Sequence, residues 1–284
     1  MCRSLARLLC PPALLLAASV SPAHAAVTIG QLAPPNSPAI CGTPAFDRIP
    51  QTVTSGNSFL VPGAGTIVSW SHNAAAGAGQ TLTMKIFRKI GDPMVYMIVG
   101  HDGPRPLAAG TLNSFPASVQ VKPGDVLGLN SGSPAQTACG FLAAGDSHLF
   151  RPGNLADGQL GEFTLSTGGD RRNISAVFVY SNAFTLSELL RNTKKGTATL
   201  TVEVPNPGEL ALSGKGVRKA GAAGARVAKS VRAAGKVKLP IRTKGSLKRK
   251  LNEAGNVTLK PRITYTPTGG DPSTQSRRLK LKKR

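Results

Sequence analysis

The segment TLTMKIFR, residues 81–88, alternates between apolar and polar side chains. In an extended strand this period of two places Leu82, Met84 and Ile86 on one side, with the threonines and Lys85 on the other. One face is therefore apolar and covers a core. The segment predicts a half-buried β-strand.

The same pattern recurs through residues 26–183, where Gly, Pro, Asn and Ser clusters interrupt it every 8 to 12 residues or so. Further strands are expected at residues 66–72, 94–99, 118–121, 126–130 and 173–180. Lys122-Pro123-Gly124-Asp125 predicts a hairpin turn, because Pro fixes φ and Gly permits positive φ. About nine strands predict an antiparallel β-sandwich of jelly-roll type.

Residues 184–284 predict a smaller sandwich. Strands are expected at residues 196–204, 209–213, 227–231, 236–241, 256–265 and 274–282. The sequence PNPG, residues 205–208, predicts a turn that returns the chain between the first two. Leu247 and Leu251, at i and i+4, predict one short helix ending at Gly255. Six or seven strands in about 100 residues predict an immunoglobulin-like or fibronectin-like fold, with the register near Val227 left open.

Charge divides the chain in the same place. Residues 26–183 hold 9 Lys and Arg against 8 Asp and Glu, a net charge of +1, whereas residues 184–284 hold 24 against 5, a net charge of +19. Lysines alternate with apolar residues in both KVKL and LKLK, so they point away from the core and are candidate polyanion-binding residues: Lys236, Lys238, Lys280 and Lys282. The alternative is that they only keep strand edges soluble.

Nucleic acid is disfavoured as the polyanion, since Phe184 and Tyr265 are the only aromatic residues of the basic region that bases could stack on. Anionic cell-wall or matrix polymers fit better, because the chain begins like an exported protein. Arg3 precedes an apolar run and a small-x-small site that predicts cleavage after Ala25. The run of about 13 residues is shorter than a membrane-spanning helix, so no transmembrane anchor is expected. Cys10 follows a bulky residue and makes a poor lipidation site.

Cleavage leaves two cysteines, Cys41 and Cys139. Exported chains meet oxidising conditions, so a disulfide between them is predicted. Two unrelated buried thiols are the alternative.

No set of residues in the sequence has the pattern of a catalytic, cofactor-binding or metal-ligating site. His101-Asp102 and Asp146-Ser147-His148 each place a base near a carboxylate, but the neighbouring glycines are typical of solvated turns. The sequence has no nucleophile elbow, phosphate loop or zinc spacing. Trp70 is either a platform for stacking a sugar or a core residue, and its position in the strand leaves both open.

Segments of both regions resemble domains of known secreted proteins. KKGTATLTVEVPNPGELALSGKGV and ITYTPTGGDPSTQSRRLKLKK resemble a basic all-β C-terminal module of uncharacterised secreted proteins of high-GC Gram-positive bacteria. VPGAGTIVSWSHNAAAGAGQTLTMKIFR and VKPGDVLGL resemble the sandwich domain that often precedes it. The resemblance implies export and two sandwiches, and brings no activity or functional residue with it.

The sequence thus favours a signal peptide at residues 1–25, a neutral domain at 26–183 and a basic domain at 184–284. We expect a secreted, extracellular, non-enzymatic surface protein that associates with the cell wall through its basic domain. The neutral domain would present a binding face, with carbohydrate as one candidate partner. A secreted carbohydrate-active enzyme is the main alternative, and a purely structural protein is the other. An enzyme requires carboxylates or histidines that converge in a groove.

Overall fold

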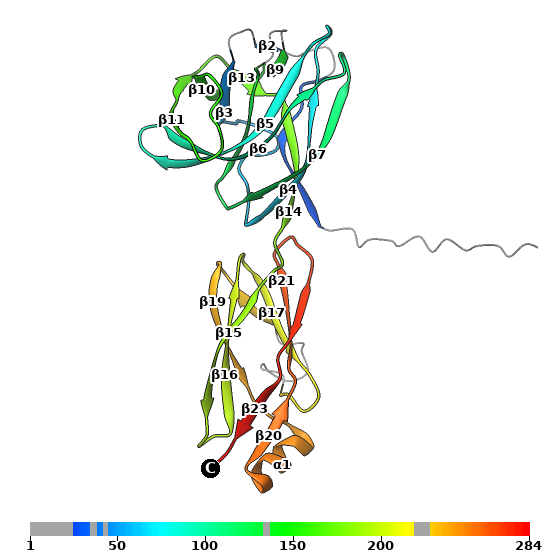
Figure 1. Cartoon of the computed structure of the whole chain (residues 1–284), viewed down its shortest axis with the longest axis vertical. Helices are drawn as coiled ribbons and strands as arrows, with labels where there is room; N and C mark the ends of the chain where they lie inside the picture. The colour runs from blue at the N-terminus through cyan, green and yellow to red at the C-terminus, as the bar shows by residue number, and fades with distance from the viewer. Residues whose placement is uncertain (1–24, 35–38, 42–44, 133–136, 219–227) are drawn as a thin grey trace, which may run out of the picture.

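The computed structural model describes residues 25–34, 39–41, 45–132, 137–218 and 228–284. Within these ranges the chain forms twenty-three strands and one short helix (Figure 1), and the paired strands are antiparallel. The all-β expectation is confirmed. Residues 1–24 of the predicted signal peptide, and Val227 with its uncertain register, lie outside the described residues.

The N-terminal region contains three sheets. One consists of β1 (Ala26–Gln31), β14 (Ile174–Tyr180), β4 (Gly65–Asn73) and β7 (Leu112–Val121). The largest consists of β11 (Leu160–Glu162), β6 (Val95–Pro106), β5 (Thr81–Gly91), β8 (Val126–Asn130), β3 (Phe46–Thr52), β10 (Ser147–Pro152) and β12 (Thr164–Ser166). The third consists of β13 (Asp170–Arg172), β9 (Thr137–Leu142) and β2 (Ala39–Cys41). The structure has more strands here than the nine or so predicted, because three-residue strands are too short to show a period.

In strand β5 one face is buried as the sequence predicts, and the other face is buried as well. Leu82, Met84 and Ile86 are at most 1% exposed and belong to the core, as their alternation predicts. The opposite face is covered as well, so the strand is not half-buried. Lys85 tolerates this burial because its Nζ lies 2.6 Å from Oδ1 of Asp47, which is itself buried.

The C-terminal region also contains three sheets. The first consists of β15 (Thr185–Asn192), β16 (Thr197–Val204) and β19 (Gly235–Ile241). The second consists of β18 (Ala228–Val231), β17 (Gly208–Ser213), β21 (Arg262–Pro267) and β22 (Ser273–Ser276). The third is the pair β20 (Asn256–Leu259) and β23 (Leu279–Lys282).

Buried apolar side chains form two separate clusters, one within residues 29–178 and one within residues 184–281. Figure 1 shows the same division, with the strands up to β14 in one lobe and the later strands with the helix in the other. Each lobe therefore encloses a core of its own.

The hairpin predicted at residues 122–125 is wrong. Residues 122–125 do form a tight turn, in which the amide of Asp125 donates to the carbonyl of Lys122 at 3.2 Å. However, this turn joins β7 to β8, which lie in different sheets, and residues 205–208 likewise join β16 to β17 across two sheets. Pro and Gly reverse the chain locally, whereas the choice of partner strand depends on which neighbours the core brings together.

Two long strands that the sequence predicts are each divided in two. Residues 256–265 form β20 and β21, and residues 274–282 form β22 and β23. The outer halves pair with each other in one sheet and the inner halves in another. The division falls at Pro261, which has no amide hydrogen for a ladder, and its carbonyl accepts from the amide of Arg277 at 3.3 Å.

The predicted helix is confirmed as α1 (Gly245–Ala254), which ends at Gly255 with a φ of 64°. In the described part of the chain, no helix has the length and apolar character needed to cross a membrane.

Candidate anion-binding site

The four nominated lysines are exposed and alternate with buried or half-buried residues, as predicted. Lys236 and Lys238 lie on β19, whereas Lys280 and Lys282 lie on β23 in a different sheet. Their outward direction is therefore confirmed, but they are divided between two sheets. Their contact with a polyanion stays a prediction.

A hollow of about 630 Å³ is lined in part by residues of α1. Figure 1 shows α1 and the C-terminus of the chain at the same end of the C-terminal lobe. Six basic residues line the hollow: Lys195, Arg218, Arg242, Lys244, Lys248 and Lys283. The described residues of its wall include no acidic side chain. We call this hollow the basic pocket, and none of the four nominated lysines belongs to it.

Backbone contacts bring distant segments together around the pocket. The amide of Arg218 donates to the carbonyl of Arg242 at 2.7 Å, and the amide of Lys244 donates to the carbonyl of Gly216 at 2.8 Å. These bonds hold the segment after β17 against the segment after β19. Lys195 comes from the turn between β15 and β16. The wall is thus assembled from segments far apart in the sequence.

Two glycines let α1 pack closely over this wall. Gly216 has a φ of 68°, and a Cβ there would lie 2.2 Å from Cδ1 of Leu247. Gly196 has a φ of 62°, and a Cβ there would lie 2.9 Å from Cδ2 of Leu251. The two leucines that predict the helix are therefore the ones that dock it, each against a glycine in the left-handed region.

The start of the helix adds to the positive potential of the pocket. The first amides of a helix have no partner within the helix, no side chain caps those of α1, and its first turn holds no acidic residue. Lys244 stands at the N-cap, and Lys248 follows within the first turn. Cations at this end repel the helix dipole, so a bound anion would lower the electrostatic energy of the site.

Sequence reasoning missed this pocket, although part of its signal was present. Arg242, Lys244 and Lys248 flank the start of the predicted helix and are visible as a local cluster. Lys195 and Lys283 reach the same hollow only through the pairing of their strands. No period or spacing in the sequence connects those two positions to the helix.

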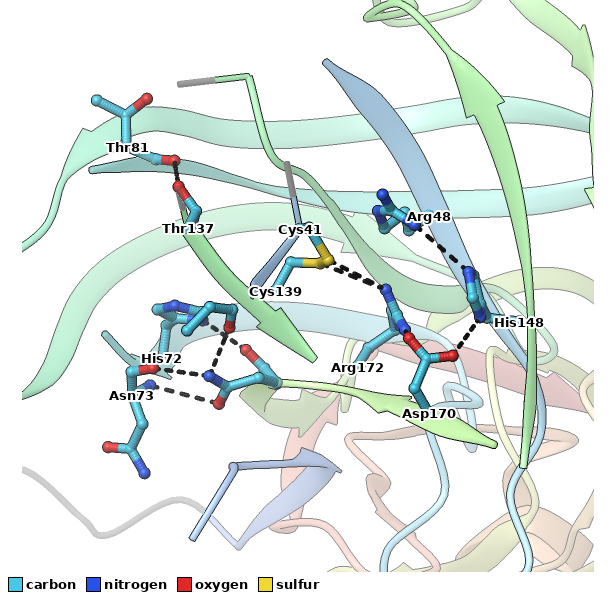
Figure 2. The surroundings of a disulfide bond; sticks show 12 residues. Cys41, Arg48, His72, Asn73, Thr81, Thr137, Cys139, His148, Asp170 and Arg172 are labelled. Carbon is cyan, nitrogen blue, oxygen red and sulfur yellow. Dashed lines mark hydrogen bonds and ion pairs between the residues drawn. A yellow bond between two sulfur atoms is a disulfide. The ribbon is translucent and has the colours of Figure 1, made fainter. Parts of the chain in front are cut away.

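In the N-terminal lobe, several charged side chains are buried in ion pairs. One of these pairs lies beside the predicted disulfide, which is confirmed. Cys41 and Cys139 are bonded, with their Cα atoms 5.6 Å apart. Figure 2 shows the guanidinium of Arg172 beside both sulfurs, with Nη1 3.5 Å from Sγ of Cys139 and 3.9 Å from Sγ of Cys41. Arg172 is fully buried and also contacts Asp170. Burial lowers the pKa of Arg172 to about 10.

His148 extends this buried network. Its Nδ1 lies 2.8 Å from Oδ1 of Asp170, and its Nε2 accepts from Nη1 of Arg48 at 3.4 Å (Figure 2). Burial lowers the pKa of His148, outweighing the opposing effect of Asp170. The sequence neighbour Asp146 instead pairs with Arg171, so the reading of Asp146 and His148 as solvated turn residues is wrong: both are buried.

The pair His101 and Asp102 is also divided, because neighbouring residues of β6 point to opposite sides of the strand. Nδ1 of His101 lies 2.7 Å from Oδ1 of Asp157, on the rim of a small hollow of about 180 Å³. Asp102 instead accepts from Arg105 and from Nε1 of Trp70.

Trp70 is a core residue. It is fully buried against Phe115, with ring centroids 4.7 Å apart, so the sugar-stacking hypothesis is wrong. In the pairing of β4 with β14, Ile67 faces Phe178 and Ser69 faces Val177, so Val68 is an extra residue in β4, and this bulge lets both Ile67 and Trp70 point inward. Simple alternation does not foresee a bulge.

Seven of the eight carboxylates of residues 26–183 lie against a basic side chain. The pairs join acidic residues to Lys, Arg or His partners: Asp47 to Lys85, Asp92 to Lys89, Asp102 to Arg105, Asp125 to Arg88, Asp146 to Arg171, Asp157 to His101, and Asp170 to Arg172. Three or more metal-ligating side chains do not gather anywhere in the described ranges. The charges of this lobe are thus largely compensated within it, unlike those around the basic pocket.

No protein family, curated protein or solved structure matches this chain.

Proposed function

We propose that this protein is exported and associates with anionic polymers of the cell envelope through its basic C-terminal lobe, without catalysing a reaction. The basic pocket carries the proposal, because it gathers six cations in one hollow without an acidic residue among its described wall residues. Such a surface attracts polyanions over about a Debye length.

The charge count supports the same proposal. Residues 184–284 hold 24 basic residues and 5 acidic ones, so one-to-one pairing within the region leaves at least 19 cations without a carboxylate. In the N-terminal lobe, by contrast, ion pairs neutralise most charges. We place the two domains at residues 26–183 and 184–284, a jelly-roll-like sandwich followed by an immunoglobulin-like one, and the two separate cores support this division.

The neutral lobe would serve as the part that presents a binding face outside the cell. The alternative of a carbohydrate-active enzyme needs free carboxylates that converge on a substrate. The ion pairs of the N-terminal carboxylates argue against that alternative. Asp47, Asp125 and Asp146, for example, are buried and each is held by a cation.

The test is co-sedimentation of the mature protein with purified cell walls at rising salt. Between about 50 and 500 mM salt the Debye length falls from roughly 14 to 4 Å, so the bound fraction should fall steeply. A variant with charge reversal at all four nominated lysines measures how much of this attraction comes from the general basic surface. Absence of binding at low salt, or binding that salt leaves unchanged, would overturn the proposal.

A further inference from the structure

The basic pocket differs from the rest of the basic surface in shape. Its cations come from the β15–β16 turn, the segment after β17, the segment after β19, the first turn of α1 and the chain end after β23. They therefore surround a hollow, whereas the lysines of β19 and β23 project from open sheet faces. A hollow lined with donors selects the shape of an anion as well as its charge.

We propose that the basic pocket binds phosphate groups of a phosphodiester polymer. This inference rests on the proposed function and names the chemical class of polymer for it. Gly245 at the start of α1 also lines the pocket, no side chain caps the first amides of this helix, and phosphate is an anion that such helix starts accommodate.

The arrangement of donors favours a phosphodiester over a carboxylate. A carboxylate is planar, and one guanidinium fork engages both of its oxygens. A phosphodiester carries its charge on two non-bridging oxygens that lie with its ester oxygens at the corners of a tetrahedron, so donors can approach it from outside a single plane. Arg218 and Arg242 supply guanidinium groups, and Lys195, Lys244 and Lys248 supply ammonium groups that act as mobile point charges.

The lining also favours a polymer without bases over a nucleic acid. Its described residues include no aromatic side chain on which a base could stack. Leu251 is the only large apolar residue among them, and it is the buried residue of α1. The hollow is larger than one phosphate group, so it has room for the polyol on either side of a phosphodiester.

The test compares two polymers and two matched double variants of the full mature chain. The polymers are poly(glycerol phosphate) and polygalacturonate, both at 150 mM salt. The pocket variant is Lys195→Gln with Lys248→Gln. The control variant is Lys238→Gln with Lys280→Gln, which removes the same charge from exposed strand positions opposite neutral threonines.

We expect the wild-type chain to bind poly(glycerol phosphate) at least ten-fold more tightly than polygalacturonate. The pocket variant should bind the phosphate polymer about thirty-fold more weakly than wild type, since each lost charge-assisted contact reduces affinity by roughly ten-fold and paired losses are not fully additive. The control should lose about three-fold. A further variant, Lys195→Arg with Lys248→Arg, should restore binding to within three-fold of wild type.

Equal losses in the pocket and control variants would overturn the pocket as the site. Equal affinity of the wild type for the two polymers would overturn the preference for phosphate, while association with anionic polymers would stand. If the wild type binds neither polymer nor cell walls, the proposed function itself fails. Circular dichroism of each variant confirms that its fold is retained, and the arginine variant distinguishes lost charge from lost structure.

Discussion

The contact between α1 and Gly216 offers a way to separate the shape of the basic pocket from its charge. Gly216→Ala leaves every cation in place but puts a Cβ 2.2 Å from Cδ1, 2.7 Å from Cγ and 3.0 Å from Cβ of Leu247. Alanine at a φ of 68° costs about 1 kcal/mol, and overpacking costs a further 1 to 3 kcal/mol or so. We expect the free energy of unfolding to fall by about 2 to 4 kcal/mol.

Gly245→Ala is the matched control. Gly245 has a φ of 57°, and a Cβ there would meet no atom within 4 Å. This variant should therefore lose only the backbone contribution of about 1 kcal/mol. The difference between the two variants isolates the contact with Leu247. In a Leu247→Ala background, which lacks Cγ and Cδ1, Gly216→Ala should cost less than it does in the wild-type chain.

The free energies come from urea unfolding of the mature chain followed by far-ultraviolet circular dichroism. Hydrogen exchange of the peptide that spans α1 should accelerate in Gly216→Ala and remain close to wild type in Gly245→Ala, because only the first displaces the helix. Binding to the phosphate polymer should weaken in parallel. If Gly216→Ala costs no more than Gly245→Ala, or if Leu247→Ala gives no relief, the docking of α1 on this glycine is refuted.

Three further predictions concern other parts of the chain. Mature protein from culture should begin at Ala26 and carry no lipid, and an intact mass that includes a diacylglyceryl group on Cys10 would contradict this. Replacing Cys41 and Cys139 by serine should lower the free energy of unfolding by about 4 to 5 kcal/mol, because the bond closes a loop with a sequence separation of 98; a loss below 1 kcal/mol in urea unfolding would speak against it. Burial lowers the pKa of His72 from 6.5 to about 4. As the pH falls from 6.5 to 4, the unfolded state therefore binds a proton at this histidine while the folded state does not. Stability should therefore be complete above about pH 7 and decline by up to about 3 kcal/mol as the pH falls from 6.5 to 4. The free energy of unfolding, measured by tryptophan fluorescence during urea unfolding, should depend less steeply on pH between pH 5 and 7 in His72→Asn than in wild type. An equal dependence on pH would disprove the assignment to His72.

Features that depend only on neighbouring residues could be predicted from the sequence. The direction of successive side chains in a strand has a period of two, so residues 81–88 and the lysines of β19 and β23 revealed their inward and outward faces without any knowledge of their neighbours. The spacing of Leu247 and Leu251 likewise located the helix. Net charge is a sum over residues, so the division between a neutral and a basic region could be counted from the sequence alone. The pairing of Cys41 with Cys139 followed from the sequence because the predicted cleavage after Ala25 leaves no other cysteine.

Which strands are neighbours depends on long-range packing and could not be predicted from local sequence. The turns at residues 122–125 and 205–208 reverse the chain in the same way whether it stays in one sheet or crosses to another, and burial of the two cores selects the crossing. A bulge in β4 turned Trp70 inward, against any simple count of alternation. The basic pocket depends on the same long-range pairing, because it brings Lys195 and Lys283 into one wall with residues of α1. Contacts of this kind are set by the packing of the whole lobe, which no local pattern encodes.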